Sequence, residues 1–432
     1  MAHKIAIVGG GAAGFFSAIE LKKMHPEAEV TIFERSKKVL AKVEVSGGGR
    51  CNCTNSFAEV KDLKQVYPRG YNLLKRLFKQ FGPKEAYQWF EEHSVPLVTQ
   101  EDQCVFPKAQ DSHVIIDCFV REARHQGVKV MCGYKVQGTE PVVKSIKGVP
   151  NGKNEEKDGK SVNDERGNAR NTFTINGETF DYLIVTTGGM TYSIESSPLS
   201  AVKEHIIQPV SSLFTFSIKD RSLHELMGTV VENTIVSIPG TKFKAEGALL
   251  ITHWGMSGPA ILKLSSHAAR HMYDEDYKVP LLVNWTGEKN ADTVKEYVLS
   301  LTSMHKNKML SSYRPFDLQQ RLWDYLTDKL GKKCRWGELG NKDINKLVDL
   351  LCNDRYDIAD RYAFKDEFVT CGGISLDAID KNSMECKYVN GLFFAGEVLD
   401  VDGVTGGFNF QAAWSTAYAA AHGISKLMEE QQ

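Results

Sequence analysis

The residues best suited to chemistry lie in a glycine-rich turn near the N-terminus. Gly9, Gly11 and Gly14 follow a short β-branched stretch that ends at Val8. Glycine permits a tight turn and close approach of the backbone to a phosphate, and a helix that begins there directs free N–H groups at it. Glu34 ends the next β-branched stretch, where a carboxylate can accept hydrogen bonds from a ribose. In this context the glycines predict a dinucleotide-binding turn rather than an ordinary strand-to-helix connection.

A second group of candidate residues lies near the C-terminus. Gly396 and Glu397 end a short apolar stretch, and Asp402, Gly407 and Asn409 precede a helical stretch. The positive end of a helix suits the part of a flavin ring where negative charge develops on reduction. The alternative is a strand and helix that only close a sheet, with Asp402 or Asn409 as the helix cap. One long cofactor, FAD, accounts for both groups of residues.

The most distinctive stretch is the polar segment from Lys42 to Asn55, which we interpret as a loop. It contains three consecutive glycines, Gly47–Gly49, followed by Arg50. Such a backbone is flexible and rich in N–H donors, so it can lie along a pyrophosphate and a flavin edge; a plain surface loop is the alternative. The residues expected to bind the cofactor are Gly9, Gly11, Ala12, Ala13, Gly14, Glu34, Arg35, Lys42, Ser46, Gly47, Gly48, Gly49, Arg50, Asn52, Val136, Thr187, Gly188, Gly189, Gly396, Glu397, Asp402, Gly407, Phe408 and Asn409.

Candidates for a catalytic acid, base or thiol are fewer. His253 can act as an acid or a base, although a structural histidine bonded to backbone is the more common case. Cys51 and Cys53 could form a redox pair, but a disulfide across one intervening residue closes a small, strained ring, so we interpret both as structural thiols. A flavin accepts a hydride without a protein nucleophile. No spacing of cysteines or histidines indicates a metal site.

The composition limits the classes of partner. The chain has 432 residues and a formal net charge of -1. Because it has no basic excess, we expect no nucleic-acid partner, although a local basic face remains compatible with this balance. No stretch approaches the ~20 apolar residues of a membrane span, and nine dispersed cysteines are typical of reduced thiols. We therefore expect a soluble, cytoplasmic protein, whose oligomeric state stays open.

The elements that must position these residues begin with a strand, a helix and a strand. Lys4–Val8, Ala12–Met24 and Glu29–Phe33 have this pattern, which is typical of a parallel sheet. Residues 213–252 have the alternation of antiparallel strands, and several helices are expected further along, before a closing helix near the C-terminus. Asn151–Asn171 is almost free of apolar residues, so we interpret it as a mobile surface loop.

These stretches resemble a known family. Ser46–Asn55 resembles a signature of the HI0933-like bacterial flavoproteins, and Thr252–Ala260, Thr370–Ile374 and Gly391–Gln411 are similar to three further motifs of that family. The resemblance spans nearly the whole chain and implies non-covalent FAD. The sequence departs from the family at Phe408, where tyrosine is usual, so any role of that hydroxyl near the flavin is in doubt.

The resemblance also implies an α/β fold, in which a glutathione-reductase-like Rossmann domain for FAD carries an inserted β-barrel-like domain and a small helical domain. We expect the FAD domain to comprise residues 1–190 and 355–432. The barrel-like substrate domain would then comprise residues 191–287 with about 353–370. The helical domain would comprise residues 288–352.

Members of this family with assigned activities look like aminoacetone oxidases or reductases of unsaturated bile acids. We therefore expect an FAD-dependent oxidoreductase that transfers a hydride between flavin and a small organic substrate, bound between the FAD and barrel domains. No second glycine-rich nucleotide turn is evident, so NAD(P)H is expected only as a transient reductant, and oxidase and reductase both remain open. The alternatives are a non-catalytic flavin-binding redox sensor and a flavoprotein of RNA modification.

Overall fold

The computed structural model describes residues 2–136, 141–144, 170–175, 177–189, 199–362 and 369–430. The chain divides into two compact units, a first unit of residues 1–209 with 372–432 and a second unit of residues 210–371. Our division into three domains therefore stays a prediction. The interpretation of Asn151–Asn171 as a loop lies outside the described residues, apart from Arg170 and Asn171, which belong to a strand.

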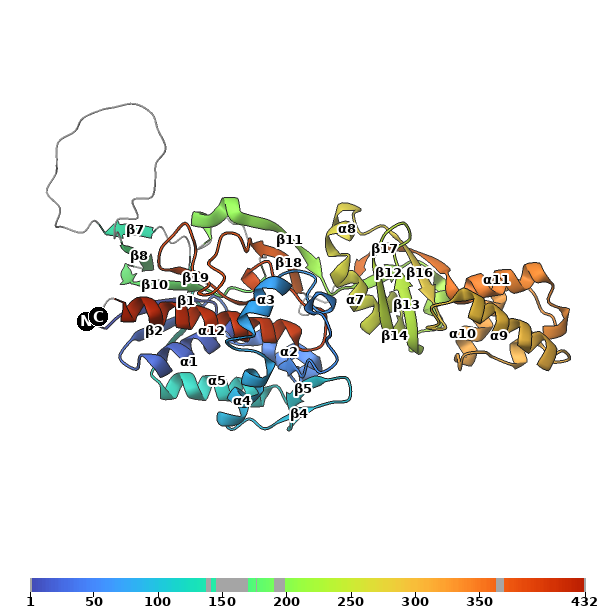
Figure 1. The fold of residues 1–432 in the computed structure, drawn as a ribbon, viewed down its shortest axis with the longest axis horizontal. Helices are drawn as coiled ribbons and strands as arrows, with labels where there is room; N and C mark the ends of the chain where they lie inside the picture. The colour runs from blue at the N-terminus through green and yellow to red at the C-terminus, as the bar shows by residue number, and fades with distance from the viewer. Residues whose placement is uncertain are drawn as a thin grey trace, which may run out of the picture. The chain divides into compact units, whose positions relative to one another are not determined.

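A five-stranded parallel sheet forms the centre of the first unit (Figure 1). Every neighbouring pair in it is parallel, which confirms the expected Rossmann-type sheet. The carboxyl ends of parallel strands meet at one edge, so the residues that follow these strands are gathered there. In spatial order the strands are β19 (Leu392–Phe394), β10 (Tyr182–Val185), β1 (Lys4–Val8), β2 (Glu29–Glu34) and β6 (Lys129–Cys132).

Two helices from opposite ends of the chain pack together beside this sheet, as Figure 1 shows. α1 (Ala12–Met24) is buried from Ala13 to Leu21, and its Ser17 hydroxyl donates to the Ala417 carbonyl of α12 (Phe408–Glu429) at 3.5 Å. Phe16 of α1 contacts the Trp414 ring of α12, with centroids 5.6 Å apart. Further helices of this unit are α2 (Ala41–Gly49), α3 (Tyr71–Leu77), α4 (Pro83–Glu92) and α5 (His113–His125).

The predicted loop from Lys42 to Asn55 is wrong in part. Its first half belongs to α2, and its last two residues form the short strand β3 (Thr54–Asn55). The helix is interrupted where Ser46 is extended and Gly47 and Gly48 have positive φ angles of 57° and 68°, a conformation that glycine adopts without steric cost. The glycines thus bend a helix rather than build a long loop.

Short strands in the described part of the chain form three further small sheets, two in the first unit and one where the chain passes between the two units. β3 pairs with β5 (Cys104–Pro107), which pairs with β4 (Leu97–Thr99). The strands β7 (Pro141–Lys144), β8 (Arg170–Ile175) and β9 (Glu178–Phe180) form another small sheet. Where the chain enters and leaves the second unit, β11 (Ile206–Ser212) neighbours β18 (Val369–Ile374). The 3-10 helices among the described residues are η1 (Leu63–Gln65), η3 (Ser200–His205), η4 (Leu310–Ser312), η5 (Trp336–Glu338) and η6 (Gly396–Val398).

The second unit is a closed six-stranded barrel with helices attached. All its strand pairs are antiparallel, as the alternating sequence predicts. Buried residues of the barrel and of the helices belong to one hydrophobic core. The strands are β12 (Thr215–Ile218), β13 (Val230–Ser237), β14 (Lys244–Thr252), β15 (Gly255–Ser257), β16 (Pro280–Asn284) and β17 (Asp354–Tyr362). The helices are α6 (Arg221–His224), α7 (Pro259–His267), α8 (Ala269–Asp274), α9 (Ala291–Met304), α10 (Gln320–Leu330) and α11 (Asn341–Cys352).

Candidate functional site

The turn after β1 is built around three glycines with different surroundings. A Cβ on Gly9 would lie 2.3 Å from the Thr186 carbonyl oxygen, and one on Gly14 would lie 2.0 Å from the Gly9 carbonyl oxygen. By contrast, no atom lies within 4 Å of a Cβ built on Gly11. Gly11 is also the N-cap of α1 and has no side chain to cap it. The turn is therefore closed on its inner side and open where a phosphate would approach the helix N-terminus.

Glu34 lies beside this turn, at the end of β2. Its carboxylate accepts hydrogen bonds from the backbone N–H of Gly10 and of Ser36, each at 2.8 Å. These bonds hold the carboxylate against the turn, where the sequence predicts the adenosine ribose. Tyr134 lies next to it, because its backbone N–H donates to the Glu34 carbonyl at 2.8 Å. The Tyr134 hydroxyl is buried and has no hydrogen-bond partner among the described residues.

This orphaned hydroxyl is a feature that the sequence reasoning missed. The Tyr134 ring lies against Phe33, with centroids 5.2 Å apart, and Val136 nearby in sequence is buried. A buried hydroxyl without a partner is costly, and a nucleoside would supply a partner. The local sequence pattern has no signal for a buried hydroxyl that lacks a hydrogen-bond partner. Arg35, predicted to bind the cofactor, is exposed at this end of the strand.

The glycines of α2 present open backbone on the same unit. Gly48 and Gly49 have positive φ angles of 68° and 82°, and each has room for a Cβ with no atom within 4 Å. The Arg50 guanidinium lies over the Phe106 ring, 4.3 Å from its centroid, and its Nε donates to the Gly47 carbonyl at 3.1 Å. These contacts orient Arg50 while the glycines stay accessible. Ser46 is less available, because its hydroxyl donates to the Val43 carbonyl at 2.8 Å.

The segment after α2 is bonded directly to the start of α12. With its amide oriented to satisfy both ends, Asn52 accepts a hydrogen bond from the Gly407 N–H at 3.1 Å and donates to the Thr54 carbonyl at 2.8 Å. Gly407 has a φ of 86°, and a Cβ on it would lie 2.1 Å from the Thr54 carbonyl oxygen. The Thr54 hydroxyl donates to Gln411 at 2.6 Å. The structure thus brings together the two chain ends that the sequence assigned to one cofactor.

A charged pair joins two further predicted residues. Lys42 of α2 lies 2.7 Å from a carboxylate oxygen of Glu397. A Cβ on Gly188, which follows β10, would lie 3.7 Å from that carboxylate, and one on Gly396 would lie 2.9 Å from the Ala13 side chain. Residues from α1, α2, β10 and η6 therefore converge at one edge of the sheet. Ala12, Thr187 and Gly189, also predicted, are half-buried in the segments at this edge.

Other residues predicted to bind the cofactor instead make hydrogen bonds or ion pairs within the protein, and these stabilise the C-terminal loop. Asp402 is fully buried and forms a bidentate pair with Arg69. The Asn409 amide bonds to Gly403 in both directions, at 2.8 and 2.9 Å. Phe408 is buried and receives a hydrogen bond from the Tyr67 hydroxyl on its carbonyl oxygen at 2.7 Å. Sequence reasoning missed Arg69 and Tyr67, because their partners lie more than 300 residues away.

The thiols beside the glycine-rich segment are buried and protonated. Burial raises the pKa of the Cys51 thiol to about 12 and the pKa of the Cys53 thiol well above its ordinary value. The Cys53 Sγ donates to the Val105 carbonyl at 3.3 Å. A redox thiol needs a populated thiolate and access to solvent, so these surroundings support the structural interpretation of both cysteines.

His253 belongs to the second unit, so its predicted place facing the flavin stays a prediction. It is exposed in the turn between β14 and β15, and its ring packs in a T-shaped arrangement with the Trp254 ring, with centroids 4.4 Å apart. Trp254 in turn stacks on Tyr362 at 4.4 Å. An exposed imidazole on a turn held by aromatic stacking can exchange protons with a ligand or with water.

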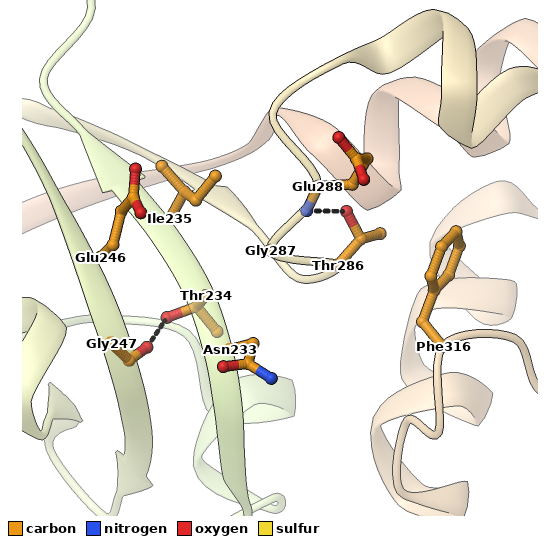
Figure 2. Close-up of a pocket in the computed structure, with 9 residues that line it drawn as sticks. All are labelled: Asn233, Thr234, Ile235, Glu246, Gly247, Thr286, Gly287, Glu288 and Phe316. Carbon is orange, nitrogen blue, oxygen red and sulfur yellow. Dashed lines mark hydrogen bonds between the residues drawn. The ribbon is translucent and has the colours of Figure 1, made fainter.

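A polar hollow of about 300 Å³ lies within the second unit, where the barrel meets the helices (Figure 2). Thr234 donates to the Gly247 carbonyl at 2.8 Å on one wall, and Glu246 and Glu288 provide carboxylates. Negative side chains do not suit the phosphates of a dinucleotide. None of the predicted cofactor residues lines this hollow, so it is separate from the candidate FAD site.

Among the described residues, no group of three or more histidine, cysteine or acidic side chains is placed to hold a metal ion. No helix in the described part of the chain is long and apolar enough to cross a membrane.

The family profile of the HI0933-like protein Rossmann domain matches residues 3–423. This chain belongs to the HI0933-like family. The resemblance carried by the four motifs is therefore confirmed, and so is the prediction of a flavoprotein enzyme of the FAD-dependent oxidoreductase class.

Three relatives of known activity align with this HI0933-like protein over nearly their whole length. A ribosomal RNA dihydrouridine synthase of Haemophilus influenzae is 28% identical, covering 97% of this chain and 98% of its own. The Escherichia coli enzyme of the same description is 26% identical over 97% of both chains. A 3-dehydro-bile acid delta(4,6)-reductase of Clostridium scindens is 24% identical, covering 98% of this chain and 99% of its own. Among solved structures, a mutated E. coli quinol fumarate reductase reaches a TM-score of 0.44 at 12% identity, covering 100% of this chain and 71% of its own, which is too low to support an inference.

The candidate site of this HI0933-like protein fits FAD on structural grounds. The uncapped N-terminus of α1 and the open space at Gly11 suit a pyrophosphate. Tyr134, whose backbone N–H donates to Glu34, has a buried hydroxyl without a partner among the described residues, which suits an adenosine. The start of α12 suits the flavin ring, because a helix N-terminus favours negative charge. The family supports FAD as the cofactor, whereas a role for NAD(P)H stays a prediction.

Proposed function

We propose that this HI0933-like protein is an FAD-dependent reductase of a carbon–carbon double bond conjugated to a carbonyl group, and that its substrate is a uracil base of ribosomal RNA. The observation that carries this proposal is the full-length similarity to relatives whose named reactions share one chemistry. A dihydrouridine synthase saturates the ring double bond of uracil, which is conjugated to a ring carbonyl. A bile acid delta(4,6)-reductase saturates double bonds conjugated to the 3-oxo group.

This chemistry favours a reductase over the oxidase that the sequence left open. When bound and reduced, FAD would supply a hydride to the carbon of the double bond that is remote from the carbonyl. The electron pair of the double bond then moves toward the carbonyl oxygen, and the other carbon takes a proton. A hydrogen-bond donor at that oxygen and an acid near that carbon are the groups the protein must add. His253 is our candidate for the acid.

The described residues support the flavin half of this proposal. We propose that the positive end of α12 faces the flavin ring; the contact between Asn52 and Gly407 fixes where this helix starts. The Lys42 ammonium, paired with Glu397 at 2.7 Å, lies at the same edge of the sheet. A positive environment stabilises the negative charge that a flavin gains on reduction. We propose NAD(P)H as the transient donor that reduces it.

Ribosomal RNA is favoured over a small molecule because two of the three relatives modify it, at the higher identities. This replaces the expectation of a small organic substrate as the first choice. A small unsaturated ketone remains the second candidate, since the Clostridium scindens relative acts on a bile acid.

A single-turnover experiment tests the proposal without knowledge of the natural electron donor. The holoenzyme is reduced with dithionite under anaerobic conditions and mixed with protein-free ribosomal RNA transcribed in vitro, or with a steroid that has a 3-oxo group and a conjugated double bond. We expect ribosomal RNA to return the flavin to its oxidised absorbance and to yield dihydrouridine on nuclease digestion and mass spectrometry. Reoxidation by the steroid alone would reject the RNA substrate, and reoxidation by neither would reject the reductase.

A further inference from the structure

Two segments of the second unit are paired at one end of its helical part. The segment after α9 and the segment before η5 lie side by side, because the Leu310 N–H donates to the Cys334 carbonyl at 2.9 Å and the Trp336 N–H donates to the Lys308 carbonyl at 3.0 Å. Leu310 and Trp336 are buried in the core and anchor the pair. Figure 1 shows the helices α9, α10 and α11 that carry these segments.

This pairing concentrates positive charge. Residues 305–314 and 331–337 contain no aspartate or glutamate. Asp343 forms an ion pair with Lys332 at 2.6 Å, and the Glu338 carboxylate accepts the backbone N–H of Arg335 at 2.8 Å. The remaining cations outnumber these acids. The six exposed cations, which we call the basic face, are Lys306, Lys308, Arg314, Lys332, Lys333 and Arg335.

Aromatic rings lie within the basic face. The His305 and Tyr313 rings are 3.9 Å apart, and the Lys308 ammonium lies 5.8 Å from the Tyr313 ring centroid. Met309, between these residues in sequence, is exposed. Cations interleaved with aromatic rings are typical of surfaces that bind RNA, because phosphates pair with the cations and unstacked bases pack on the rings.

The whole chain does not share this charge. Its formal net charge is -1, so no general attraction to nucleic acid is expected, and the basic face is a local exception. The hollow in the same unit has carboxylates on its wall, which shows that positive charge is not spread evenly over this unit.

We propose that the basic face binds the phosphodiester backbone of ribosomal RNA and so docks the RNA on the second unit. This inference rests on the proposed function, in which ribosomal RNA provides the uracil. Phosphate contacts fix the position and register of an RNA without reading its sequence. The basic face is therefore a docking surface and takes no part in the chemical step.

A pair of charge-reversal variants tests the proposal in the FAD-loaded, full-length protein. The first variant carries Lys308→Glu and Arg335→Glu in the basic face. The matched control carries Lys242→Glu and Lys244→Glu, two exposed cations near the turn between β13 and β14, where Phe243 contacts His271 of α8. Flavin content and melting temperature of both variants check folding, and Lys308→Gln with Arg335→Gln replaces the first variant if it fails to fold.

Binding of the same ribosomal RNA transcript is measured as a function of salt. Each lost phosphate contact lowers the slope of log K against log salt by roughly 0.7–0.9. We expect the basic-face variant to lose two contacts and to bind at least about tenfold more weakly at ~0.1 M salt, while the control stays within about twofold of the parent. Equal binding and equal slopes in the two variants would overturn the proposal.

Dihydrouridine formation separates this proposal from the proposed function. Reduction of free uridine monophosphate should be the same in the parent, the basic-face variant and the control, since a mononucleotide does not need the docking surface. RNA binding that depends on the basic face without any dihydrouridine would support the face and contradict the proposed function. Dihydrouridine in ribosomal RNA formed equally by all three proteins would support the function and contradict the face.

Discussion

The residues of the candidate site are of two kinds. Some border open space, and others already make their hydrogen bonds within the protein. Gly11 and Gly48 border open space. Asp402 and Asn409, which the sequence assigned to the cofactor, make their hydrogen bonds within the protein. A group already bonded inside the protein stabilises the loop that carries it. The roles of the predicted residues are therefore separable by measurement of cofactor affinity and of stability.

Lys42 should matter for FAD and hardly for the fold. Its side chain is 58% exposed in its pair with Glu397, and exposed ion pairs contribute little to stability. We expect Lys42→Ala to lower the melting temperature by less than about 2 °C and to raise the FAD dissociation constant about tenfold, as loss of a charged hydrogen bond does. The measurements are thermal unfolding and FAD titration of the apoprotein. Lys38→Ala, which removes a similar exposed pair with Glu44, is the control, and an equal loss of affinity there would contradict this role.

The buried thiols should make the fold sensitive to alkaline pH. Burial raises the pKa of Cys51 from its ordinary value of 9.0 to about 12, so the folded protein holds this proton more tightly than the unfolded chain. The stabilising contribution is fully present below about pH 9 and is lost as the pH rises through the folded pKa.

We expect native protein at neutral pH to react with a thiol reagent at the exposed Cys132 and not at Cys51 or Cys53. Mass mapping of the labelled peptides checks this, and rapid labelling of Cys51 in the native protein would show that this thiol is accessible to solvent.

At the scale of elements, the start of α1 should respond differently to two similar substitutions. Gly14→Ala places a Cβ 2.0 Å from the Gly9 carbonyl oxygen, so we expect it to prevent α1 from docking and to lose both folding and FAD. Gly11→Ala meets no protein atom and has an ordinary φ of -94°, so it should leave the melting temperature of the apoprotein nearly unchanged. It should still weaken FAD at least about tenfold, because the methyl group occupies the phosphate position. FAD titration measures the affinity and melting of the apoprotein measures the stability. Unchanged FAD affinity of Gly11→Ala would show that the pyrophosphate does not bind at this turn.

The segment before α3 and the loop before α12 are joined by the Arg69 and Asp402 pair. Because Asp402 is fully buried, Arg69→Met removes the cation of this buried ion pair, and we expect a loss of about 3–5 kcal/mol in the free energy of unfolding. The double variant with Asp402→Leu should recover part of this loss, since it also removes the buried negative charge. Urea unfolding followed by tryptophan fluorescence measures both. A double variant less stable than Arg69→Met alone would show that Asp402 has a further partner that dominates.

At the scale of the whole molecule, the second unit should fold alone. It is the continuous segment 210–371 with its own hydrophobic core, whereas the first unit is built from both chain ends. The neighbouring strands β11 and β18 lie where the chain enters and leaves the second unit, so its ends are close together. We expect residues 210–371 to express as a colourless protein with one cooperative unfolding transition, measured by circular dichroism. A chain in which a short linker replaces that segment should still bind FAD, and failure of both pieces to fold would show that the units depend on each other.

The amino-acid sequence by itself determined the Rossmann-type unit, the FAD assignment and the antiparallel second unit. Each of these depends on short-range patterns: a glycine spacing after a β-branched stretch, an acidic residue after the next strand, and alternation along a strand. The closing helix was also predictable, because an apolar period continues through it. In the structure this helix begins at Phe408. The bent helix over Ala41–Gly49 was missed, since consecutive glycines favour a loop on local propensity.

Only the tertiary structure decided which candidate residues lie close together and which already make their hydrogen bonds or ion pairs within the protein. Asp402 finds Arg69 across 333 residues, and Asn52 meets Gly407 across the length of the chain. The basic face likewise exists only because buried Leu310 and Trp336 hold two separate segments together, in a chain whose net charge is close to zero. The physical reason is that a side chain's partner is set by packing of elements far apart in sequence, while local periodicity reports only which face of its own element a residue occupies.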